Sequence, residues 1–180
     1  MAAVPYIPTI VVDTVIEALA LFLAPFVGNE LGNTTTPTPI IRAQVNRVPP
    51  PLPGFVELRD LMQKNLGMPI QIQNPDPDIQ QATISTFTQL DVQIDFYGPN
   101  AGDWARAVEA VFRSLYAPDQ FPAGIAPLYC SDARQAPLVT GEEQYENRYI
   151  LTASLEYNPD VIVPQQSATS LTTSIFEDLQ

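Results

Sequence analysis

Residues 84–116 read ISTFTQLDVQIDFYGPNAGDWARAVEAVFRSLY, and this stretch decides the fold. Its first part alternates: even-numbered positions up to 96 are mostly apolar, while most odd-numbered positions carry Ser, Gln or Asp. Because successive side chains of a strand point to opposite faces, the pattern predicts one long strand over residues 84–96, wet on one side. The even-numbered positions include Ile84, Thr88, Leu90, Val92, Ile94 and Phe96.

After the turn Gly98-Pro99-Asn100, the spacing of apolar residues changes to every three or four positions. This spacing predicts a helix over residues 101–116. Asn100 stands at the N-cap position, with Asp103 three residues later as in a variant capping box. The apolar face comprises Ala101, Trp104, Ala105, Val108, Val111, Phe112 and Leu115. We expect Trp104 and Phe112 to pack between helix and sheet.

Further elements flank this centre on both sides. From Val12 to Phe26 the three-and-four spacing predicts a first helix, with Asp13 or Thr14 suited to its first turn. Residues 145–157 alternate strictly and predict a second long, half-exposed strand.

Shorter strands are predicted between these elements. Residues 40–47 and 55–62 are interpreted as a hairpin around a stiff, proline-rich turn, and residues 128–139 contain one or two short strands. Glycine- and proline-rich loops are expected at residues 28–39, 67–78 and 118–127, and a C-terminal arm at residues 167–180. The order predicts one α+β domain over residues 1–180: an antiparallel-rich mixed sheet with two helices packed on one face.

The composition indicates an acidic protein without nucleic-acid affinity. Twenty Asp and Glu against eight Lys and Arg give a net charge of −12 over 180 residues, whereas tight binding to a phosphate backbone needs clustered cations. The apolar residues 18–27 are too short to span a bilayer, and no basic residue precedes Arg42, so we expect neither a membrane span nor a signal peptide.

Catalytic chemistry has little support in the sequence. Histidine is absent, so the chain lacks the commonest general base and the commonest zinc ligand. Both glycine-rich phosphate-loop patterns are also absent, so the sequence gives no support for nucleotide chemistry. Asp91 and Asp95 share one strand face but stand roughly 13 Å apart at about 3.3 Å per residue, too far for a paired-carboxylate hydrolase. Asp76 and Asp78 lack the remainder of a calcium loop. Cys130 is interpreted as a small core residue. We therefore predict that the protein is not an enzyme and that it binds no cofactor or metal ion.

Three phrases carry a family resemblance. They are FYGPN at residues 96–100, PLYCSD at residues 127–132 and Tyr157-Asn158-Pro159. With the surrounding residues 90–166, and more loosely residues 44–51 (QVNRVPPP), the chain resembles the phage neck terminator family, akin to tail terminators.

The resemblance implies a structural virion protein: a ring, usually sixfold, at the head-proximal end of the tail, assembled in the host cytoplasm. Its partners would be further copies, the tail tube protein and the head-tail connector or neck proteins, with DNA passing through the lumen without specific binding. It implies no catalytic residues.

Six residues are candidates for contacts with a neighbouring subunit or another partner. They are Arg134, Glu142, Glu143, Arg148, Ile175 and Phe176. Each arginine could pair with a neighbour's acidic residues or equally within its own chain. The two glutamates are equally explained as solvated loop charges. We expect the C-terminal arm to dock on a neighbour through its isoleucine and phenylalanine. A non-enzymatic adaptor or ligand-binding module remains an alternative function.

Overall fold

The computed structural model describes residues 8–27, 38–43, 54–74, 76, 80–136, 138–139 and 145–164. Two α-helices, one 3₁₀ helix and the strands of three sheets make up this part of the chain. In chain order they are α1 (Val12–Leu23), β1 (Ile40–Arg42), β2 (Phe55–Asn65), β3 (Ile70–Gln73), β4 (Gln81–Ser85), β5 (Thr88–Tyr97), α2 (Ala101–Phe112), η1 (Ala117–Gln120), β6 (Ile125–Cys130), β7 (Arg134–Gln135), β8 (Leu138–Val139), β9 (Tyr145–Glu146), β10 (Arg148–Tyr157) and β11 (Asp160–Pro164). The α+β prediction is confirmed.

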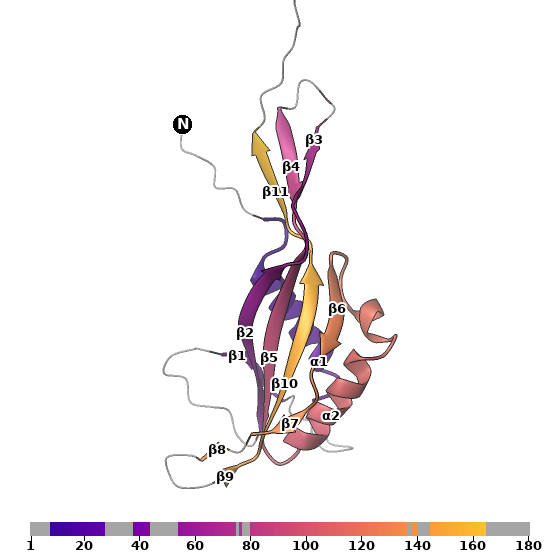
Figure 1. The fold of residues 1–180 in the computed structure, drawn as a ribbon. Helices are drawn as coiled ribbons and strands as arrows, with labels where there is room; N and C mark the ends of the chain where they lie inside the picture. The colour runs from indigo at the N-terminus through magenta and orange to yellow at the C-terminus, as the bar shows by residue number, and fades with distance from the viewer. Residues whose placement is uncertain are drawn as a thin grey trace, which may run out of the picture.

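The main sheet has the order β1-β2-β5-β10-β6, with β7 pairing beside β10 (Figure 1). All neighbours are antiparallel except β1 and β2. The central strand β5 pairs along its whole length with β10 on one side and β2 on the other. The alternation that predicted β5 and β10 therefore comes from their central position, where one face is covered by the core.

A narrow arm projects beyond one end of the main sheet, as Figure 1 shows. It consists of β11, β4 and β3 in that order, all antiparallel. Each arm strand lies next in the chain to a long strand of the main sheet: β3 follows β2, β4 precedes β5 and β11 follows β10. The arm thus continues three neighbouring strands past the region that the helices cover.

The core lies between the helices and the even-numbered residues of β5. Both helices contribute to one apolar cluster with the sheet, which confirms that they pack on one face. The largest fully buried side chains include Phe96, Leu19, Leu23, Leu58, Leu90, Ile94, Leu151 and Leu155. Trp104, Phe112 and Cys130 belong to the cluster, so their prediction as core residues is also confirmed.

The predicted hairpin of residues 40–47 and 55–62 is wrong. β1 ends at Arg42 and runs parallel to β2, with Ile40 beside Val56. A parallel pair needs a long crossover rather than a tight turn, and the stretch between Arg42 and Phe55 has that length. The other edge of β2 is occupied by β5. Most of the predicted stiff turn lies outside the described residues.

The single long strand predicted over residues 84–96 is two strands. β4 ends at Ser85 and β5 begins at Thr88, because the backbone between them changes partners. The Thr86 amide donates to the Pro159 carbonyl at 3.2 Å, and the Phe87 carbonyl accepts from the Leu66 amide at 2.8 Å. The predicted loop of residues 67–78 is likewise wrong in part, since it contains β3.

The second helix ends earlier than predicted. α2 stops at Phe112, and Leu115, expected on its apolar face, is 93% exposed. The Ser114 amide and hydroxyl both bond the Val111 carbonyl, which tightens the last turn. Asn100 holds the N-cap position without a side-chain capping bond. The predicted loop at residues 118–127 contains part of η1 and the start of β6.

Candidate assembly surfaces

The face of the main sheet opposite the helices is polar but only partly wet. The registers of β2, β5 and β10 place Glu57 beside Asp95 and Asp91 beside Ser154 on this face. Asp95 is 0% exposed and Ser154 is 1% exposed, so the face that was predicted to be wet is buried in part. A buried carboxylate must be compensated locally, and the side chains around it supply the partners.

Asp95 is held by a charge and an amide. Arg148 Nη2 and Nε donate to Asp95 Oδ1 at 3.1 and 3.3 Å, and Gln93 Nε2 donates to Oδ2 at 2.8 Å. The Arg148 guanidinium also lies 5.5 Å from the centre of the Tyr97 ring. For Arg148, the structure therefore shows an ion pair inside its own chain, and a role at an interface stays a prediction.

Asp91 has its own set of donors. Ser154 Oγ donates to Asp91 Oδ1 at 2.5 Å, and Gln89 Nε2 donates to the same oxygen at 2.7 Å. Gln89 also reaches the Tyr129 hydroxyl at 3.1 Å. Both carboxylates thus fasten neighbouring strands together, an arrangement that serves structure and does not form an acid–base pair.

Tyr97 closes this network at the end of β5. Its ring stacks on Phe55 with the ring centres 4.4 Å apart, and its hydroxyl donates to Glu57 Oε2 at 3.3 Å. Burial, followed by the nearby negative charge of Asp95, raises the pKa of Tyr97 to about 12. The folded state therefore keeps this phenol protonated where an unfolded chain would begin to lose the proton.

We expect the alkaline stability of the chain to depend on Tyr97. Because its folded pKa lies above the ordinary value near 10, its contribution is complete below about pH 10 and is lost as the pH rises toward 12, by about 2 kcal/mol. Urea unfolding at a series of pH values should show a shallower decline for Tyr97→Phe. The exposed position of Tyr116 supplies the control, and Tyr116→Phe should follow the parent chain. Equal declines for Tyr97→Phe and the parent chain would contradict the assignment.

A second polar cluster joins α2 to the segment after β6. Glu109 accepts from Arg113 Nη1 at 2.9 Å and from the Ala133 amide at 3.1 Å, while Arg113 Nη2 reaches Asp132 at 2.7 Å. Burial raises the pKa of the Cys130 thiol beside it, as expected for an inert core cysteine. Within the described residues, no three His, Cys, Asp or Glu side chains gather closely enough to hold a metal ion.

The structure describes two of the six predicted interface residues, Arg134 and Arg148. Arg134 lies exposed on β7, and no described acidic side chain stands within ion-pair distance of it. Glu142, Glu143, Ile175 and Phe176 lie outside the described residues. The structure therefore does not bring the six predicted residues together, and their roles at an interface stay predictions.

A surface that the sequence analysis missed runs along β2 and β3. Among the described residues, seven of the thirteen large exposed apolar side chains lie here or beside it on β11: Leu61, Met62, Leu66, Met68, Ile70, Ile72 and Ile162. The alternation of isoleucine and glutamine in β3 could have revealed it, but the flanking prolines favoured a loop. Contiguous exposed apolar side chains mark interaction surfaces.

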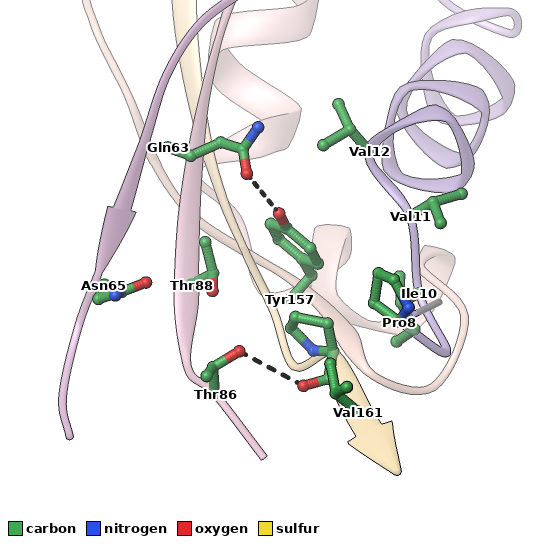
Figure 2. A pocket seen from close by; sticks show the side chains of 11 residues that line it. Pro8, Ile10, Val11, Val12, Gln63, Asn65, Thr86, Thr88, Tyr157 and Val161 are labelled. Carbon is green, nitrogen blue, oxygen red and sulfur yellow. Dashed lines mark hydrogen bonds between the residues drawn. The ribbon is translucent and has the colours of Figure 1, made fainter. Parts of the chain in front are cut away.

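A groove of about 460 Å³ lies where the arm leaves the main sheet, beside the start of α1 (Figure 2). Its lining is mostly apolar and includes Ile10, Val12 and Val161. Figure 2 shows Tyr157 donating its hydroxyl proton to Gln63 Oε1 across one side, a bond of 3.0 Å. Burial raises the pKa of Tyr157.

A known family matches most of the chain. The profile of a family described as phage neck terminator protein matches residues 13–178, which is nearly the whole chain. No curated protein matches. None of the helices in the described part of the chain is long and apolar enough to cross a membrane.

Proposed function

The chain belongs to the phage neck terminator family, and from this premise we propose that it forms a ring, most simply a hexamer, at the head-proximal end of the tail. The family is one of structural proteins of the phage neck, so the chain has a structural role in the virion. In this proposal residues 1–180 act as one terminator domain that ends the tail tube and joins it to the head connector.

The surfaces of the chain support assembly through unlike patches. A closed ring of identical subunits needs two complementary surfaces on each copy. One side of the molecule offers the exposed apolar residues of β2 and β3, and Arg134 on β7 offers an uncompensated cation among the described side chains. These features differ in chemistry, so each would meet a different surface of a neighbouring copy.

The net charge supports passage of DNA without binding. Six copies of a chain with charge −12 would carry −72. We propose that part of this charge lines the lumen, where like-charge repulsion keeps the phosphate backbone from adhering. Lysines or arginines lining the lumen of an assembled ring would refute this part of the proposal.

The proposed partners follow from the position of the ring. One ring face would meet the tail tube protein and the other the connector or neck proteins, with assembly in the host cytoplasm before incorporation into the virion. Because the family match carries this proposal, the first experiment concerns assembly.

We expect the purified chain to form rings as its concentration rises. Light scattering or native mass spectrometry across a concentration series should show a shift from monomer to one closed oligomer, and negative-stain images should show rings. Tail tubes, added to the monomer as templates, provide a second condition. A monomer in both conditions would overturn the ring.

The groove of Figure 2 favours the alternative of a ligand-binding module, because its volume and apolar lining are within the range of small-molecule sites. This alternative requires a stable monomer that binds apolar probes. Binding of a fluorescent apolar dye to a monomeric chain, and loss of that binding in Val12→Trp, would support this alternative. If Val12→Trp assembles into rings as the parent chain does, the result would favour the terminator function.

A further inference from the structure

The outer edge of β2 and β3 is open over most of its length. β2 pairs with β1 only from Val56 to Leu58, and β3 is the last strand of the arm. All four residues of β3 are exposed. In the described part of the chain, the backbone amides and carbonyls on this edge therefore lack strand partners, which makes the edge a template for an added strand.

The arm also presents an apolar face next to this edge. The registers place Ile72 beside Thr83 and Thr83 beside Ile162, so the two isoleucines share one face. Ile70, Ile72 and Ile162 are 48, 58 and 49% exposed. An added strand at the edge would bring every second side chain over this face.

We propose that residues 165–180 of a neighbouring copy add to this edge as a strand antiparallel to β3. The inference rests on the proposed assembly of copies and names the contact that joins them. This segment follows Pro164, the last residue of β11, and its sixteen residues can reach about 50 Å when extended. Its odd positions Thr169, Leu171, Thr173 and Ile175 are apolar or β-branched, and the even positions between them are Ser or Thr. This alternation suits a strand with one face on the isoleucines.

Charge fixes the direction and register of the added strand. Lys64, near the end of β2, is exposed and is the only lysine in the chain. The spacing from Leu171 to Glu177 equals the spacing from Ile70 to Lys64. In an antiparallel pairing that starts with Leu171 opposite Ile70 and continues past residues 66–69, which belong to neither strand, Glu177 comes opposite Lys64.

The segment of the same chain could also reach this edge. β11 and β3 lie on opposite edges of the arm with β4 between them, so a segment leaving Pro164 has about 10 Å to cross before it meets its own β3, well within its extended length. We assign the contact to a neighbouring copy because the proposed assembly needs a contact that joins copies, and the cross-linking experiment below separates the two cases. The exchange between copies would link each subunit to the next around the ring.

Cross-linking between labelled copies tests the pairing. Chains grown with heavy nitrogen and ordinary chains are mixed, allowed to assemble and treated with a carbodiimide, which joins an amine to a carboxylate. Mass spectrometry should find Lys64 joined to Glu177 of the other isotope. Links confined to one isotope would mean that the segment docks on its own chain and would overturn the proposal.

A charge exchange provides the second test. We expect Lys64→Glu to weaken assembly at least about tenfold, and Lys64→Glu with Glu177→Lys to restore it. Asp178 faces the opposite side of an extended strand, so Lys64→Glu with Asp178→Lys is the matched control and should restore less. Circular dichroism checks that each variant folds.

The outcomes separate this contact from the ring itself. Closed rings that tolerate Lys64→Glu, or a chain ending at Ser167 that assembles normally, would overturn the docking and leave the ring proposal intact. Open chains of copies with the expected cross-link would support the docking and refute the ring. Absence of any association would overturn both.

Discussion

Replacing Arg148 with methionine is expected to lower the free energy of unfolding by about 3–5 kcal/mol. The substitution keeps the length of the side chain but removes the cation from Asp95, which is 0% exposed and receives two of its hydrogen bonds from the guanidinium. Only Gln93 would then compensate a buried carboxylate near the end of β5. Urea unfolding at neutral pH measures the loss.

Arg106 supplies the matched control. It pairs with Glu109 at 3.2 Å, but its side chain is 77% exposed, whereas that of Arg148 is 19% exposed. Exposed pairs contribute about 0–1 kcal/mol, so Arg106→Met should be nearly neutral. Adding Asp95→Asn to Arg148→Met should recover much of the loss. Similar small losses for both single variants would show that water reaches Asp95 and compensates it.

The elements predicted best from sequence are those whose environment is uniform along their length. β5 and β10 lie at the centre of the sheet, and the core covers the same face of both from end to end. Their alternation therefore records burial directly. α2 was predicted for the same reason, since one of its faces meets the sheet. Only the predicted last turn is missing: the helix ends at Phe112, and the next residue, Arg113, donates a hydrogen bond to Asp132.

The elements predicted worst depend on partners that are distant in the chain. Nothing near Ile40 indicates that β1 runs parallel to β2, because pairing direction is set by the path of the connection. The break between β4 and β5 depends on contacts with Leu66 and Pro159. In β3, the isoleucines are exposed and stand outside the core that the described residues form, so a burial pattern cannot identify the strand.

The candidate surfaces show the same division. Because the chain has only eight basic residues, Arg134 and Arg148 are candidates for contacts between copies, but only the structure separates an exposed arginine on β7 from one that compensates a buried aspartate. Lys64 is scarcer still, yet its meaning depends on the open edge beside it. In the structure of a single chain, assembly surfaces are recognised chiefly as exposed side chains and open strand edges that have no partner among the described residues.

Phe22 packs the first helix against three other aromatic rings. Phe22 is 4% exposed and stands with its ring centre 5.1 Å from that of Phe121, 5.7 Å from that of Phe112 and 5.4 Å from that of Phe26. It thereby joins the first helix to α2 and to the segment after η1. The three-and-four spacing of residues 12–26 predicts an apolar helix face but cannot identify the rings that this face meets.

Phe22→Ala is expected to lower the free energy of unfolding by about 3–5 kcal/mol, because it removes the ring and leaves a cavity among three others that cannot all close it. Leu21→Ala is the control: the neighbouring side chain is 77% exposed on the same helix, so its loss should change the stability by less than about 0.5 kcal/mol. Denaturant unfolding of both variants gives the comparison. If α1 docked only loosely on the sheet, the two substitutions would cost similar amounts, and the single core described for the helices and main sheet would have to be divided.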